Sequence, residues 1–168
     1  GRARPACCPC SWPAGPGPRR EGARRSATAA QAVVMKVVDT NVIAYLYLPG
    51  EHTPVVEGLL TADPDWASPI LWRSEFRNIL AGCLRRGSLT FEQACSIQHE
   101  AEGLLTGAEY EVDSRSVLEL ARSSGCSAYD CEFVALANDL RTRLITMDRE
   151  LLRAFPGVAI DLTGARGG

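Results

Sequence analysis

Short apolar runs that predict β-strands alternate with longer helical patterns from Met35 onward, and this alternation limits the possible folds more than any other feature. The predicted strands cover residues 36–38, 66–68, 109–112, 143–147 and 158–160. The predicted helices cover residues 40–48, 54–61, 69–86, 90–106, 113–123, 127–140 and 149–154. Alternation of this kind is typical of a parallel sheet whose strands are joined by crossover helices. The sequence therefore predicts an α/β fold with a central, mainly parallel sheet.

The first 34 residues differ from the rest of the chain. Gly, Pro, Ala and Arg dominate this segment, and it has no periodic apolar face. Such a composition predicts a disordered extension. We therefore expect Met35 to be the functional start, with residues 1–34 as an extension or a mis-assigned start, followed by one domain at residues 35–168. The alternative is that residues 1–34 form a dispensable disordered arm.

The charge is distributed unevenly between these two parts. Residues 1–34 carry a net charge of +5, and residues 35–168 carry −7. Nucleic-acid-binding domains usually carry a basic face, so a polyanionic substrate would here depend on a local patch and on metal charge. The longest apolar run, residues 42–48, is too short to cross a bilayer, and no membrane association is expected.

Seven cysteines at irregular spacings argue against a secreted disulfide framework. Cys83, Cys95 and Cys131 lie in apolar helical patterns, which predicts that they are small core residues. Reduced thiols fit a cytoplasmic protein.

Four carboxylates stand at the edges of hydrophobic segments: Asp39, Glu75, Asp130 and Asp148. Two of them directly follow predicted strands, and functional groups of open α/β sheets collect at the carboxyl ends of strands. Negative charges gathered there repel one another unless protons or cations neutralise them. An all-oxygen site of this kind favours Mg²⁺ or Mn²⁺.

Each acid also has a purely structural explanation. Asp39 and Asp148 could cap helices, Asp130 could belong to a capping box, and Glu75 could pair with Arg73 or Arg77. The same two arginines are the best local candidates for phosphate contacts. Their alternative role is to pair with nearby acids on a solvated helix face.

The two histidines, His52 and His99, lie in a loop and in a polar stretch. We expect both at the surface. Acid–base chemistry carried by histidine is therefore disfavoured for this site.

These local sequences also resemble the PIN-domain family, most closely the VapC-like toxins of bacterial toxin–antitoxin pairs. The resemblance rests on Val-Val-Asp39-Thr-Asn-Val, on Ser-Glu75 before an apolar helix, on Ala-Tyr-Asp130, and on Leu-Ile-Thr146-Met-Asp148. The four pieces occur in the family's order across residues 39–152. The 34-residue extension has no counterpart in these toxins.

The resemblance implies a PIN-like three-layer α/β/α sandwich and an endoribonuclease that depends on Mg²⁺ or Mn²⁺. Asp39, Glu75, Asp130 and Asp148 would hold one or two metal ions, partly through water. Thr146, with Asn41 as a further candidate, would orient ligands or water. The implied partners are an RNA substrate, a cognate antitoxin protein and a second copy in a homodimer.

Two alternatives remain at this point. One is a housekeeping PIN-domain ribonuclease without an antitoxin. The other is a Mg²⁺-dependent phosphoryl-transfer α/β domain, which would need a second Asp two residues after the first, or an Asp pair with a distant Lys. Asn41 occupies that position, and Lys36 is the only lysine, so the second alternative is weaker.

Overall fold

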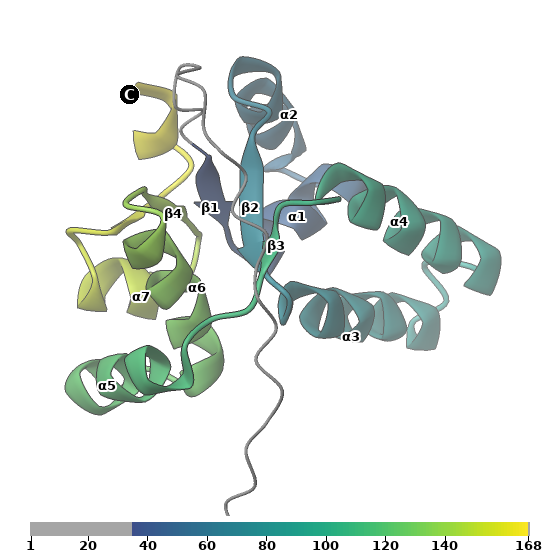
Figure 1. The fold of residues 1–168 in the computed structure, drawn as a ribbon. Helices are drawn as coiled ribbons and strands as arrows, with labels where there is room; N and C mark the ends of the chain where they lie inside the picture. Colours follow the sequence, from purple (N-terminus) through teal and green to yellow (C-terminus); the bar gives the residue numbers. More distant parts are fainter. Residues whose placement is uncertain (1–34, 168) are drawn as a thin grey trace, which may run out of the picture. The chain divides into compact units, whose positions relative to one another are not determined.

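A five-stranded parallel sheet runs through the part of the chain that the computed structural model describes, residues 35–167 (Figure 1). The strands are β1 (Lys36–Val38), β2 (Trp66–Pro69), β3 (Glu109–Tyr110), β4 (Leu144–Ile145) and β5 (Ala159–Ile160). Each lies within or close to a strand predicted from the sequence. The extension predicted at residues 1–34 lies outside the described residues.

The strand order is β3-β2-β1-β4-β5, and all four pairings among the described strands are parallel. The chain builds outward from β1 to β3 on one side and then crosses to β4 on the other. The order therefore reverses beside β1. In open α/β sheets, ligands bind outside the carboxyl ends of the strands at such a reversal point.

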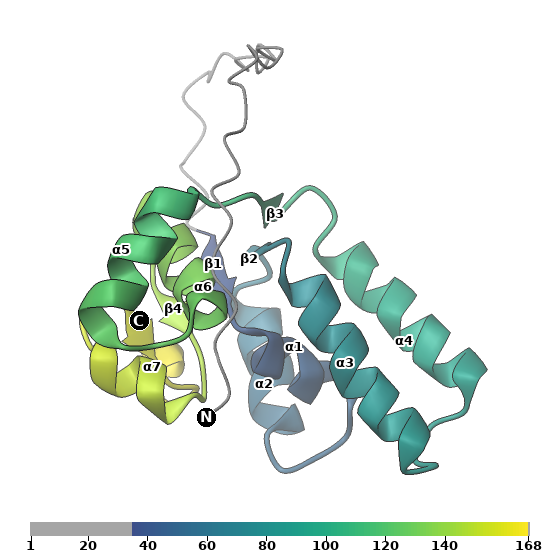
Figure 2. The same cartoon turned by 90° about the horizontal axis from the view of Figure 1, so that it is seen from below.

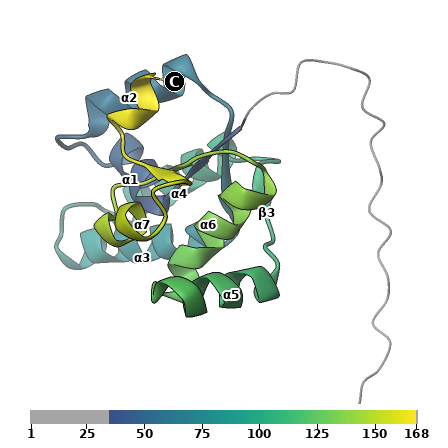
Figure 3. The ribbon, with the colours of Figure 1, turned by 90° about the vertical axis from the view of Figure 1, so that its left-hand side faces the viewer.

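Helices cover both faces of the sheet and complete the predicted three-layer α/β/α sandwich (Figures 1 and 2). One side carries α1 (Thr40–Tyr47), α2 (Thr53–Ala62), α3 (Trp72–Arg85) and α4 (Phe91–Leu104). The other carries α5 (Ser114–Ser124), α6 (Ala128–Asp139) and α7 (Arg149–Ala154), and a short 3₁₀ turn, Gly164–Gly167, ends the described chain. Figure 3 shows α5 on the outer side of α6, which itself packs against β1, β2 and β4.

Side-chain caps fix several helix starts where the sequence predicts them. Thr90 and Gln93 form a complete capping box at α4. Asp113 caps α5, and Ser127 caps α6. Helix α3 begins three residues later than predicted, because Pro69 is the last residue of β2 and lies opposite Tyr110 in the sheet.

The core consists of strand side chains and the inward faces of the helices. Its largest fully buried members include Trp66, Trp72, Phe76 and Phe133. Cys83 and Cys131 are buried as predicted, whereas the prediction for Cys95 is wrong because its side chain is exposed. The neighbouring Ala94 lies on the buried face of α4. Successive residues of a helix are rotated by about 100°, so Cys95 lies outside that face.

Within residues 35–167, the helices are all too short or too polar to span a membrane.

Glu109 links β3 to α3. Its carboxylate accepts hydrogen bonds from the Trp72 indole (2.7 Å) and from the Arg73 guanidinium (2.5 and 2.7 Å). Arg73 also pairs with Glu102 of α4 at 3.0 Å. The Arg73 guanidinium holds the pKa of Glu109 below its ordinary value. This network ties the edge strand to the two helices beside it.

We expect Glu109→Gln to destabilise the fold at pH 7 by about 1.5–3 kcal/mol, the usual contribution of hydrogen bonds to charged groups. Because the folded-state pKa is lowered, this stabilisation exists above the ordinary pKa of 4.5 and is lost as pH falls through the lowered value. The difference in unfolding free energy should therefore shrink toward pH 3 in urea titrations. Glu111→Gln, at an exposed neighbouring position, is the matched control. A difference that stays constant with pH would contradict the role assigned to the Glu109 charge.

Candidate active site

All four predicted carboxylates line one cavity of about 240 Å³ at the carboxyl ends of β1 and β4. They come from separate parts of the chain: the residue after β1, the first turns of α3 and α6, and the residue before α7. The strand order reverses at this place, so topology brings them together. The lining residues are Asp39, Thr40, Asn41, Glu75, Asn78, Ile79, Asp130 and Asp148.

Asp39 and Thr146 are neighbours because β1 and β4 pair in register. Val38 lies opposite Ile145, and the Asp39 N–H donates to the Ile145 carbonyl at 3.0 Å. The Thr146 hydroxyl then donates to Oδ2 of Asp39 at 2.6 Å, with both side chains buried. Although Asp39 stands at the N-cap position of α1, its carboxylate makes no capping hydrogen bond among the described residues. The carboxylate lines the cavity, and the backbone N–H groups of Asn41 and Thr40 at the start of α1 lower its pKa against the effect of burial.

Two more acids are held by hydroxyl groups. The Thr40 hydroxyl donates to Oε2 of Glu75 at 2.6 Å, joining α1 to α3. The Ser127 hydroxyl donates to Oδ2 of Asp130 at 2.6 Å and accepts from the Asp130 N–H at 3.1 Å. Ser127 thus caps α6 and orients the acid in its first turn.

Asp148 is held by backbone groups. Its Oδ1 accepts from the N–H groups of Glu150 (2.7 Å) and Leu151 (3.1 Å), so it caps α7 as one reading of the sequence predicted. The Asp148 N–H donates to the Thr146 hydroxyl oxygen at 2.9 Å. Thr146 therefore connects Asp148 to Asp39 through a single oxygen atom.

One pattern runs through the four acids: a hydroxyl or backbone N–H fixes one carboxylate oxygen of each. Among the described residues, no arginine or lysine pairs with any of them. The second oxygens are left to act on whatever enters the cavity.

Comparison with known proteins identifies the fold family. The family model of the PIN domain matches residues 36–156, most of the chain. The chain belongs to the PIN-domain family. Ribonuclease VapC3 of Pyrobaculum aerophilum is 30% identical over 125 residues, covering 73% of this chain and 95% of that protein.

Solved structures agree on the PIN fold. The crystal structure of PAE2754 from Pyrobaculum aerophilum superposes with a TM-score of 0.64 at 21% identity, covering 81% of this chain and 92% of that one. The structure of FitAcB from Neisseria gonorrhoeae gives a TM-score of 0.59 at 19% identity, covering 77% and 99%. At these identities the likeness concerns the fold alone.

Burial and like charge dominate the electrostatics of this PIN-domain cavity. Desolvation raises the pKa of Asp39, which is 6% exposed; the hydrogen bond from Thr146 opposes the shift, and repulsion from Asp148 adds to it. The pKa of Glu75 is raised chiefly by burial and further by Asp39, Asp130 and Glu132. Both groups thus favour protonation, or a cation, in the cavity.

The donor set fits a hard divalent cation held partly through water. Carboxylate, hydroxyl and amide oxygens line the cavity, and these are the ligands that Mg²⁺ and Mn²⁺ accept. Within residues 35–167, however, no three His, Cys, Asp or Glu side chains are gathered closely enough to enclose an ion directly. The cavity of about 240 Å³ has room for water, and Mg²⁺ usually keeps several waters of its own.

The two arginines predicted to contact RNA lie away from this cavity. Arg73 is engaged by Glu109 and Glu102, which is the ion-pairing alternative that the sequence left open. Arg77 is exposed and donates to the Ser74 hydroxyl at 3.2 Å. Their contact with RNA stays a prediction.

The two histidines also lie away from the cavity lining. His99 is exposed as expected, and His52 is half-buried against the Tyr45 ring, with 4.6 Å between ring centroids.

Several residues of the site escaped sequence reasoning. Thr40 and Ser127 stand at the starts of two predicted helices and were given no role in the site, although their hydroxyls position Glu75 and Asp130. Asn78 lines the cavity three residues after Glu75, one helical turn along α3. The i, i+3 spacing from a candidate acid is the signal that could have found Asn78.

In metal-free buffer, Asp39→Asn should raise the melting temperature by several degrees at pH 7–8. The folded-state pKa of Asp39 is raised above its ordinary 3.8, so the wild-type fold loses stability as pH rises through that raised pKa. The mutant lacks this charge, and its advantage should shrink as pH falls toward 4. Thermal unfolding with a chelator at several pH values measures this. Asp113→Asn, an exposed helix cap with a lowered pKa, should show no such gain.

Proposed function

We propose that this PIN domain is a divalent-metal-dependent endoribonuclease and the toxin of a toxin–antitoxin pair. The observation that carries the proposal is the shared cavity lined by Asp39, Glu75, Asp130 and Asp148. The 30% identical Ribonuclease VapC3 supports RNA as the substrate. We further propose a cytoplasmic homodimer, as expected from the resemblance.

All four acids line the cavity, and one oxygen of each is held by a hydrogen bond. In our proposal the four carboxylates bind Mg²⁺ or Mn²⁺, directly or through water. A bound divalent ion would lower the pKa of an attacking water and stabilise negative charge on the scissile phosphate. Thr146 keeps the carboxylate of Asp39 in place through a hydrogen bond that favours its charged form.

The remaining cavity residues position the substrate. The side-chain amides of Asn41 and Asn78 offer both donors and acceptors for phosphate or ribose oxygens. The acids would repel an RNA phosphate without a cation, so cleavage should require one. In this arrangement the charge of the metal ion, and not basic residues of the cavity, would attract the phosphate.

Asp39→Asn and Asp130→Asn should each lower metal-dependent RNA cleavage at least 100-fold while the fold remains intact, because the metal ligands act as a unit. Cleavage of single-stranded and structured RNA, at matched Mg²⁺ or Mn²⁺ concentration, measures the effect. Because Asn also caps helices, Asp148→Asn removes the charge of Asp148 and keeps a side chain that can cap α7. This variant therefore separates the role of the charge from the role of the cap. Its matched control is Asp113→Asn at the start of α5. Full residual activity of the Asp39 or Asp130 variant would refute the site.

An apolar groove supports a protein partner near this site. It measures about 370 Å³ and lies between α3, which also carries Glu75, and α4. Its rim includes Phe91, which is 67% exposed. We propose that an antitoxin segment lies along these helices and inserts an arginine among the carboxylates. A guanidinium would satisfy the same oxygens by bidentate hydrogen bonds.

Expression of the wild-type chain alone should arrest growth, and expression of the Asp39→Asn variant should not. Because the antitoxin arginine and the metal would compete for the same oxygens, inhibition of the purified protein should weaken as Mg²⁺ rises. Growth curves and cleavage assays at increasing Mg²⁺ check these two expectations. If the wild type is harmless and yet cleaves RNA, the housekeeping ribonuclease becomes the better reading. If it also leaves RNA uncut, the nuclease proposal fails.

A further inference from the structure

A second cavity, of about 490 Å³, lies at the opposite end of the sheet and is lined by basic residues. Lys36 begins β1 and Arg143 immediately precedes β4, so this cavity stands at the amino ends of the two strands whose carboxyl ends carry the acids. Arg141 and the Thr142 hydroxyl complete its polar lining. We call it the basic cavity.

Arg141 is held in an unusual backbone conformation. Its φ is +51°, and it is the one residue other than glycine with positive φ in residues 35–167. It follows the end of α6, where the Thr142 N–H donates to the Ala137 carbonyl at 2.9 Å and the Arg141 N–H donates to the Asn138 carbonyl at 3.1 Å. These two bonds form a Schellman motif, whose left-handed residue is usually glycine.

The chain follows that rule at its other left-handed positions. Gly87, Gly107 and Gly125 carry the positive φ values after α3, after α4 and after α5. An arginine in this conformation is strained by its Cβ. Strained residues persist where function requires them. The structural alternative is that Arg141 only complements the negative end of the α6 dipole.

The charges in the basic cavity are only partly compensated. Lys36 pairs with Asp63 at 3.0 Å. Arg143 donates one hydrogen bond to the Gly157 carbonyl at 2.6 Å, and neither Arg141 nor Arg143 forms an ion pair within the described residues. Two exposed arginines therefore line one cavity in a part of the chain, residues 35–168, whose net charge is −7. Guanidinium groups match phosphate by paired hydrogen bonds.

We propose that the basic cavity binds a phosphate of the RNA substrate several nucleotides from the bond that is cut. This inference rests on the proposed function. Asp130 and Arg141 stand at opposite ends of α6, whose twelve residues span roughly 18 Å. Successive nucleotides of a stacked strand rise about 3.4 Å along the helix axis, so about five nucleotides would separate the two sites along that axis.

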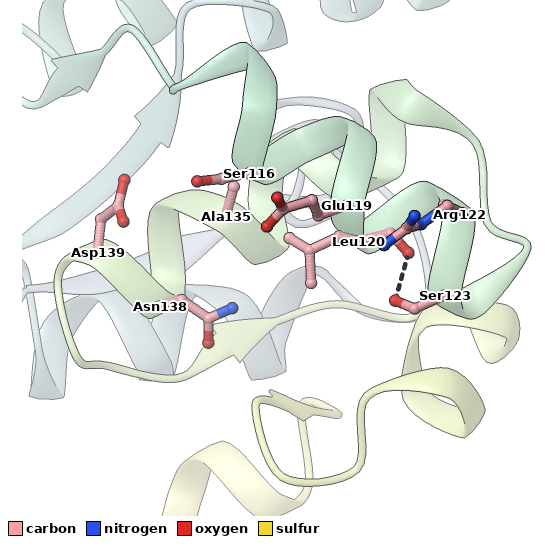
Figure 4. A pocket seen from close by; sticks show the side chains of 8 residues that line it. All are labelled: Ser116, Glu119, Leu120, Arg122, Ser123, Ala135, Asn138 and Asp139. Carbon is pink, nitrogen blue, oxygen red and sulfur yellow. Dashed lines mark hydrogen bonds between the residues drawn. The ribbon is translucent and has the colours of Figure 1, made fainter.

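The neighbouring groove makes a poorer RNA path. It lies between α5 and α6 and shares Asn138 with the basic cavity (Figure 4). Glu119 and Asp139 line it and repel phosphate, with Arg122 as its one cation among the described lining residues. The RNA should therefore leave the basic cavity on the side away from α5.

Binding of labelled single-stranded RNAs of 20 and 4 nucleotides tests the proposal, using the full chain with Asp39→Asn to prevent cleavage. Arg141→Gly combined with Arg143→Gln should weaken binding of the 20-mer roughly tenfold at 0.1 M salt and lower the salt slope by about 0.7 per arginine. Binding of the 4-mer should not change. Arg115→Gln removes another exposed arginine, which pairs with Glu119 on α5, and should leave both affinities unchanged.

Thermal unfolding separates the proposal from the structural alternative. Arg141→Gly restores the residue that the Schellman motif favours, so its melting temperature should equal or exceed that of the wild type. A lower melting temperature with unchanged RNA affinity would show that Arg141 only complements the helix dipole, and would overturn the proposal. An equal loss of affinity for both RNA lengths would overturn the proposal too. So would binding of inorganic phosphate that depends on these arginines, if binding of RNA does not depend on them.

Cleavage by chains that keep Asp39 distinguishes the two proposals from each other. If the wild type cuts the 20-mer and the arginine variants cut it equally well at limiting RNA concentration, only the basic-cavity inference fails. If the wild type cuts no RNA at any metal concentration, the proposed function fails.

Discussion

The hydrogen bond from the Asp39 N–H to the Ile145 carbonyl closes the pairing of β1 with β4, and the site depends on it. It brings together two positions that are 107 residues apart, so that the Thr146 hydroxyl reaches the Asp39 carboxylate. A shift of one residue in this pairing would turn Thr146 to the other face of the sheet. The register of two very short strands therefore decides whether the cavity has its most buried acid in place.

The four acids show how negative charge is kept in a small volume without cationic side chains. Hydroxyl and backbone N–H donors stabilise each carboxylate locally, but they add no net positive charge. An arginine or lysine in the cavity would neutralise the field that attracts a cation. Burial raises the pKa values of Asp39 and Glu75, and repulsion from the neighbouring acids adds to the shift. The fold thus carries an unfavourable electrostatic free energy in the cavity, and binding of the expected cation would lower it.

Local sequence patterns predicted most of this structure. Helix caps such as Thr90 and Asp113 could be read directly, because capping involves residues only a few positions apart. The positions of the four acids relative to strands and helices also followed from local patterns. Strand order and register could not be read, since they depend on contacts between distant segments. The same limit hid the pairing of Arg73 with Glu109 and the hydroxyl support that Thr40 gives to Glu75.

The shortness of the strands has a further consequence. The acid and basic cavities lie at opposite ends of strands that are only two to four residues long. The separated charges give this region a local electric dipole moment along the strand direction. A polyanion near that surface would experience a torque that turns the basic end toward it before contact. Because the Debye length is about 8 Å at physiological ionic strength, this steering is short-ranged, and it would affect the rate of encounter more than the affinity of the final complex.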